Sequence, residues 1–185
     1  MEFCLHYEGK LKSRDNASGK HQIRQQLHPQ IRSICLSDQF RDMFEERNGT
    51  PPKSGGPHMF SEIGGKRFWF LVCEGYKTIV DLDITILLPH AVGAIVHNGG
   101  DIDNRIKTLF DALRIPAVTS EIPSNDSFNY GTEGMFCLLQ DDKLINRVSI
   151  TSYQDHEPID SDSVRCFIEV KTKITQLLVG NLGLV

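Results

Sequence analysis

The chain has 185 residues, of which 39% are hydrophobic, and 24 acidic against 20 basic residues give it a formal net charge of −4. This length and composition are typical of a single globular domain and exclude general disorder. The negative net charge excludes a uniform attraction to nucleic acid, so binding of DNA or RNA would need a local basic patch.

No stretch of the sequence has the length of a membrane span or the pattern of an export signal. The longest apolar stretches, such as residues 84–89 and 177–185, are far shorter than the about 20 residues that cross a bilayer. Glu2 stands where a signal peptide has lysine or arginine. The five cysteines are scattered and form no Cys-x-x-Cys pair, which is typical of reduced, buried thiols. We expect a cytoplasmic protein that does not bind membranes.

The N-terminal part of the chain predicts one strand and two short helices. Loosely alternating residues over 2–8 favour a strand that Gly9 ends. Apolar residues at helical spacing predict a helix over 18–27. Pro29 fits the first turn of a second short helix, which we expect over 29–34.

A third helix and a loop are expected next. Ser37 is a suitable N-cap for a helix over 38–47. Residues 50–57, Thr-Pro-Pro-Lys-Ser-Gly-Gly-Pro, cannot form regular structure and predict a surface loop. A domain boundary is the alternative at this loop, but fewer than about 60 residues precede it, which would give a weak independent core.

Residues 67–73 and 78–88 predict strands because both are rich in aromatic and β-branched residues. A short connection over 74–77 joins them, so we expect a β-hairpin. In the second strand polar residues alternate with leucine and isoleucine, which predicts one covered face and one wet face.

The clearest helix begins at Asp101 or Ile102 and ends at Arg114. Pro116 stops it, because proline cannot continue a helix. Its apolar residues recur at helical spacing and share one face: Ile102, Ile106, Leu109, Phe110 and Leu113.

A long insertion and three strands are expected in the remainder of the chain. Residues 115–139 form the insertion, which is rich in serine, asparagine, glycine and acidic residues over 120–134, and a strand is expected over 135–139. Further strands are expected over 144–151 and 164–170. These elements predict an α+β fold in a single domain over residues 1–185, with a mixed β-sheet packed by helices.

Acidic residues gather in the sequence at the start of the clearest helix. Asp101 and Asp103 follow two glycines, whose permissive backbone allows the bend that would bring both carboxylates to one ion. Lys107 follows Asp103 by one turn, on the side opposite the apolar face. Asp141 and Asp142 lie between two predicted strands and supply a further carboxylate at a sheet edge, with the choice between the two left open.

Three carboxylates with positions left for water suit Mg²⁺ better than Zn²⁺. A lysine beside such an ion fits phosphoryl chemistry, in which the ammonium stabilises growing negative charge. The structural alternative is a helix cap, an i, i+4 ion pair between Asp103 and Lys107, and a solvated aspartate turn. A Ca²⁺-binding module is a further alternative, but no regular Asp-x-Asp-x-Asp-Gly loop supports it.

Four pieces of the sequence follow the order of a known motif: Gly-Asp-Ile-Asp-Asn at 100–104, Lys107, Asp-Ala-Leu at 111–113, and Asp141-Asp142. This pattern resembles the signature of RusA-type Holliday-junction resolvases. The match to the signature is specific over 100–113 and fair over 141–145. The resemblance implies a small homodimeric α+β endonuclease that uses Mg²⁺ or Mn²⁺ to make paired nicks in branched DNA. It implies Asp101, Asp103 and Asp142 as metal ligands and Lys107 as the catalytic lysine, with Asn104 and Asp111 in supporting roles.

The chain departs from the family pattern in two ways. The connection over 114–140 is longer than is usual in the family, and the chain as a whole is not basic. Contacts with DNA phosphates are therefore expected from one basic segment, whose candidate residues are Lys10, Lys12, Arg14, Lys20 and Arg24. A solvated basic face is the alternative for this segment. The alternative function is a catalytically inactive DNA-binding or assembly protein that retains the fold.

Overall fold

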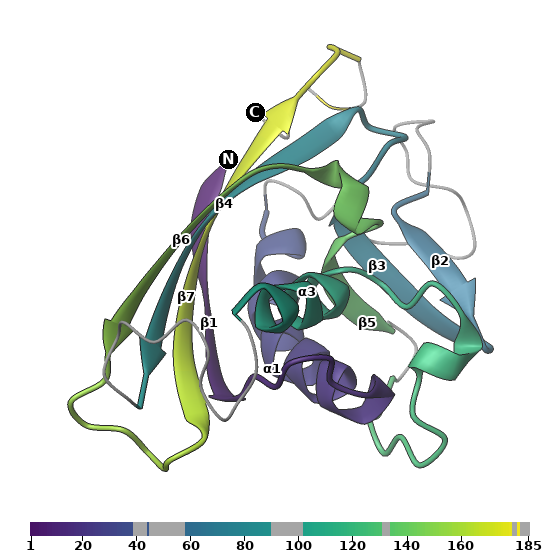
Figure 1. Cartoon of the computed structure of the whole chain (residues 1–185). Coiled ribbons are helices and arrows are strands. Elements are labelled where there is room, and N and C mark those ends of the chain that lie inside the picture. The colour runs from purple at the N-terminus through teal and green to yellow at the C-terminus, as the bar shows by residue number, and fades with distance from the viewer. Residues whose placement is uncertain (39–43, 45–57, 90–101, 131–133, 179–180, 182–185) are drawn as a thin grey trace.

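The protein has an α+β fold in which two mixed β-sheets enclose helical elements (Figure 1). The computed structural model describes residues 1–38, 44, 58–89, 102–130, 134–178 and 181. The predicted fold class is confirmed, with two sheets where one was expected. The loop expected over 50–57 and most of the helix expected over 38–47 lie outside the described residues.

The larger sheet has the strand order β1-β7-β4-β6, formed by β1 (Glu2–Lys10), β7 (Ser163–Ile174), β4 (Thr78–Leu88) and β6 (Ile145–Gln154). β7 pairs antiparallel with both β1 and β4, whereas β4 pairs parallel with β6. The inner face of β7 is buried at every second residue, as the sequence alternation predicts: Val164, Cys166, Ile168, Val170 and Thr172.

The smaller sheet has the order β2-β3-β5, formed by β2 (Phe60–Ile63), β3 (Lys66–Val72) and β5 (Met135–Leu139). β3 pairs parallel with β5, so the predicted hairpin between residues 67–73 and 78–88 is wrong. The two strands exist, but the chain passes from one sheet to the other between Cys73 and Thr78. There the Thr78 hydroxyl accepts a hydrogen bond from the Cys73 backbone N–H at 2.8 Å. Lys77, with φ of 54°, completes this turn.

One helix, α1 (Ala17–Cys35), replaces the two short helices that the sequence predicted. Its buried residues form a continuous stripe at i, i+4 spacing: Ile23, Leu27, Ile31 and Cys35. A proline inside a helix costs about 3 kcal/mol, whereas each buried aliphatic side chain contributes about 1.5–3 kcal/mol. Burial of the stripe therefore outweighs the cost of the proline, and the helix continues past the exposed Pro29. α1 contacts β1 of one sheet and β5 of the other, so it lies between the two sheets (Figure 1).

The second long helix, α3 (Ile102–Leu113), agrees with the predicted one to within a residue. Ile106, Leu109 and Leu113 are buried and face α1 and β5. Two short 3-10 turns follow along the chain, η1 (Thr119–Glu121) and η2 (Asp142–Leu144). None of the described helices is long and apolar enough to cross a membrane.

Candidate functional site

α3 presents Asp103 and Lys107 to solvent. Asp103 lies in the first turn and Lys107 in the second, and both side chains are exposed because the buried stripe of α3 occupies the opposite face. Within the part of the chain that the structure describes, neither side chain forms a hydrogen bond or an ion pair. The i, i+4 ion pair of the structural alternative is therefore not formed.

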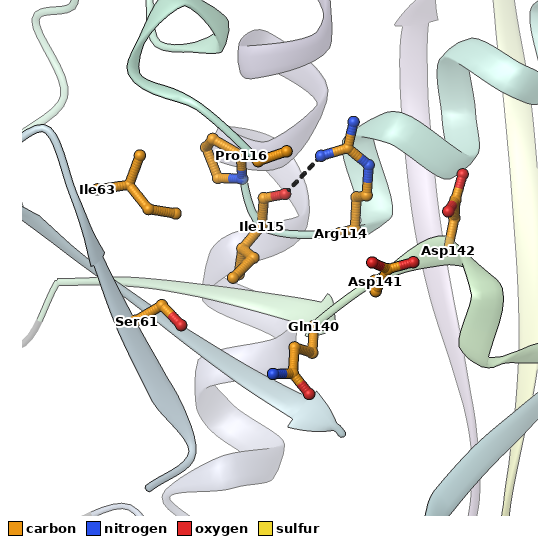
Figure 2. Close-up of a pocket in the computed structure, with 9 residues that line it drawn as sticks. Ser61, Ile63, Arg114, Ile115, Pro116, Gln140, Asp141 and Asp142 are labelled. Carbon is orange, nitrogen blue, oxygen red and sulfur yellow. Dashed lines mark hydrogen bonds between the residues drawn. The ribbon is translucent and has the colours of Figure 1, made fainter. Parts of the chain in front are cut away.

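η2 presents Asp142 next to α3. Asp141 caps η2, since its Oδ1 accepts a hydrogen bond from the Lys143 backbone N–H at 3.0 Å. The exposed Asp142 makes no such contact with a described residue, and its side chain points from η2 toward α3 (Figure 2). Because η2 packs against α3, Asp142 lies beside the helix that carries Asp103 and Lys107.

Asp101, the third predicted metal ligand, lies outside the described residues. Among the residues that are described, no group of three or more histidine, cysteine, aspartate or glutamate side chains is placed to hold a metal ion. The structure thus brings together the elements that carry Asp103, Lys107 and Asp142. The remaining carboxylate of the predicted set, that of Asp101, belongs to a residue that is not described.

The basic segment contributes one side chain near the start of α3. Arg14 is exposed, and its Nε lies 3.5 Å from Oδ1 of Asn104, the residue after Asp103. Lys12 is exposed as well. Lys10 is exposed but forms an ion pair of 3.5 Å with Asp162. A cationic group therefore stands beside the first turn of α3.

The prediction that Arg24 contacts DNA is wrong, because its side chain is 0% exposed and cannot reach a phosphate. Lys20 is largely occupied too, since its Nζ lies 2.6 Å from Oδ2 of Asp111 on α3. Burial opposes ionisation of Asp111, but Lys20 and Arg114 outweigh it and lower its pKa. Lys20 and Arg24 thus help α1 to pack against α3 and its C-terminal end. The net charge of the segment does not reveal this role.

A set of partly buried ionic contacts fixes the segment after α3. Arg114 donates two hydrogen bonds of 3.0 Å to the carboxylate of Glu121 and one of 3.1 Å to Asp111. Arg24 lies 3.6 Å from the same glutamate. Bidentate arginine–carboxylate pairs are among the strongest polar contacts in proteins. They hold residues 114–121 in one conformation.

This segment forms one wall of an open cavity of about 510 Å³ (Figure 2). Ser61 and Ile63 come from β2, Ile115 and Pro116 follow α3, and residues 140–142 follow β5. Asp142 therefore borders both the cavity and α3. The cavity was not predicted, because three segments far apart in the sequence build it and none of them carries a recognisable motif.

A buried cluster around Asp126, in the long insertion, was also not predicted from the sequence. The Asp126 side chain is 1% exposed, and its oxygens lie 2.8 Å from Lys66 Nζ, 2.6 Å from the Tyr130 hydroxyl and 3.2 Å from His21 Nε2. Burial raises the pKa of Asp126, but hydrogen bonds from Lys66 and Tyr130 outweigh it and lower this pKa to about 2. The cluster ties the insertion to α1 and β3.

No protein-family model, curated protein or solved structure matches this chain. The function is therefore inferred from the chemistry of the residues described above. Exposed carboxylates on neighbouring elements, such as those of Asp103 and Asp142, offer the hard oxygen donors that Mg²⁺ and Mn²⁺ prefer. The ammonium of Lys107, which has no partner among the described residues, is suited to an anionic substrate such as a phosphodiester.

Proposed function

We propose that this protein is a Mg²⁺-dependent endodeoxyribonuclease that hydrolyses phosphodiester bonds in branched DNA such as Holliday junctions. One observation carries the proposal: Asp103, Lys107 and Asp142 are exposed, without a described partner, on two elements that pack against each other. Their exposure leaves the carboxylate oxygens accessible to a metal ion and the ammonium accessible to a phosphate.

The donor set fits the proposed metal. Asp103 and Asp142 offer carboxylate oxygens, and Asp101 precedes α3 directly in the sequence as the third candidate ligand. Mg²⁺, with Mn²⁺ as a substitute, would neutralise phosphate oxygens and lower the pKa of a water molecule. Lys107, one turn from Asp103, would stabilise the negative charge that grows on the phosphate during attack.

The partners follow from this chemistry. Arg14 is exposed near the start of α3 and, with the exposed Lys12 two residues earlier in the chain, would bind phosphates of the DNA strand that enters the site. A four-way junction has paired strands to be nicked, so a homodimer with two equivalent sites would match its symmetry.

Cleavage of a synthetic four-way junction with Mg²⁺ tests the proposal. We expect nicks by the wild type and a loss of at least about a hundredfold in rate for Asp103→Asn and for Lys107→Ala. Glu169→Gln, an exposed acid on β7, is the matched control and should cleave at the wild-type rate. Titration with Mn²⁺, followed by electron paramagnetic resonance, should show weaker metal binding for Asp103→Asn but not for Lys107→Ala.

Junction binding without nicks by the wild type would refute the nuclease and favour the inactive DNA-binding protein. Equal cleavage by wild type and Asp103→Asn would refute the assigned site. A gel-shift assay in the absence of metal separates loss of binding from loss of chemistry, because Asp103→Asn removes a negative charge and should not weaken the attraction to DNA.

A further inference from the structure

The cavity beside Asp142 has the size of a ligand site and lies next to the proposed reaction centre. Its volume of about 510 Å³ falls within the range of roughly 300–1,000 Å³ that small-ligand pockets occupy. Asp142 lines it, so a group bound there would be adjacent to a phosphate held by the metal ion proposed at Asp142 (Figure 2).

The charges around the cavity disfavour an anion. Arg114 lines it, but its guanidinium is already bonded to Glu121 at 3.0 Å and to Asp111 at 3.1 Å. The carboxylates of Asp141 and Asp142 repel negative groups. A phosphate therefore does not suit the interior of the cavity, whereas a neutral group does.

The walls suit a planar neutral ring. Ile63, Ile115 and Pro116 give the cavity aliphatic surfaces that contact the face of a ring through dispersion. Ile115 is only 6% exposed and is fixed by a hydrogen bond of 2.9 Å from its N–H to the Leu139 carbonyl. One wall is thus rigid before any ligand arrives, which lowers the entropic cost of binding.

Two polar groups are available to the edge of such a ring. Gln140 Oε1 accepts a hydrogen bond of 3.1 Å from the Glu74 backbone N–H, which orients the amide. Its Nε2 then lies on the side of Ser61 (Figure 2). Within the described chain, neither this nitrogen nor the Ser61 hydroxyl has a hydrogen-bond partner. An oriented donor and a hydroxyl match the alternating acceptors and donors of a nucleobase edge.

We propose that this cavity binds an unstacked nucleobase of the branched DNA, adjacent to the phosphate that the proposed metal ion would hold near Asp142. The inference rests on the proposed function, since it takes DNA as the ligand. Bases at a branch point stack and pair less firmly than those inside a duplex, so turning one out of the stack costs less there. Holding that base would fix the position of the cleaved phosphate.

The test uses four-way junctions that carry the fluorescent base 2-aminopurine at each branch-point position in turn, with the full-length protein in EDTA so that the DNA stays intact. 2-Aminopurine is quenched by stacking on other bases, and the aliphatic walls described above do not quench it. We therefore expect emission at one position to rise on binding. Ala117→Trp, which places an indole in the cavity, should abolish this rise.

Two further variants make the result specific. Gln140→Ala removes the free donor, and we expect it to weaken junction binding about tenfold, which is the size of one good base contact. Val118→Trp is the matched control, because Val118 is 54% exposed next to Ala117 but does not line the cavity. It should leave both the rise in emission and the affinity at wild-type values.

The outcomes separate the two proposals. Binding and Mg²⁺-dependent nicking without any rise in emission, or with the same rise in Ala117→Trp, would overturn the base site and leave the nuclease standing. A rise that Ala117→Trp abolishes, without nicking in Mg²⁺, would support the base site and overturn the nuclease. No binding of any junction by the wild type would overturn both.

Discussion

Arg24 Nε donates a hydrogen bond of 3.0 Å to the backbone carbonyl of Arg114 and so joins α1 to the end of α3. A second nitrogen of the same guanidinium donates to the Asp111 carbonyl at 2.5 Å. Carbonyls at the end of a helix lack partners within the helix, and a cation suits the negative end of its dipole. This buried arginine therefore fixes the end of α3 against α1.

Arg24→Met should lower the free energy of unfolding by about 2–4 kcal/mol. The variant approximates the apolar part of the side chain but removes the donors to the partly buried carbonyls of Asp111 and Arg114. Urea unfolding measures the change. Gln22→Met, on the exposed side of the same helix, is the control and should change stability by less than about 0.5 kcal/mol. Equal midpoints for the two variants would contradict the role given to Arg24.

Asp142→Asn should reduce junction cleavage at least about a hundredfold, whereas Asp141→Asn should reduce it far less. Asparagine serves as an N-cap nearly as well as aspartate, so the cap on η2 survives in the second variant. Cleavage rates measured side by side decide between the two aspartates. A larger loss in Asp141→Asn would reverse the assignment.

Asp126 should make the protein sensitive to acid. Its pKa is lowered from 3.8 to about 2 in the folded state, so its contribution to stability is complete above a pH of about 4 and is lost as the pH falls toward about 2. The loss amounts to about 2 kcal/mol. Among the described residues, five groups contact the carboxylate and remain in the variant used for comparison: His21, Gln25, Lys66, Tyr130 and the Phe128 backbone N–H.

Urea unfolding of wild type and Asp126→Asn at several pH values measures this contribution. The variant should be less stable at neutral pH, and its stability should change less between pH values of about 4 and 2. Parallel pH profiles for the two proteins would show that Asp126 titrates normally in the folded state.

One thiol should react rapidly with a thiol reagent in the native protein, and four should react only on unfolding. Cys4 is exposed, whereas Cys35, Cys73, Cys137 and Cys166 are buried. Burial raises the pKa of Cys137 and of Cys166 to about 12, which suppresses the reactive thiolate. Counting the thiols that react with the reagent, with and without denaturant, checks this. Cys4→Ser should remove the fast phase, and more than one fast thiol would contradict the described burial.

The sequence by itself determined the elements whose signal is local. Helical spacing of apolar residues identified α3, and strict alternation identified β7, because each pattern reflects one buried face of one element. The same spacing placed Asp103 and Lys107 on the solvent side of α3, one turn apart. Residue types then indicated the chemistry, since carboxylates and a lysine in that order suit a metal ion and a phosphate.

Only the tertiary structure decided which elements meet. β3 pairs with β5 and not with β4, and α1 continues through Pro29, because burial against distant segments outweighs local turn and helix-breaking signals. The burial of Arg24 and the cavity between Ser61 and Gln140 depend likewise on residues far apart in the chain. Such contacts leave no periodic trace in the sequence, because each element's pattern records that one of its faces is covered and not which element covers it.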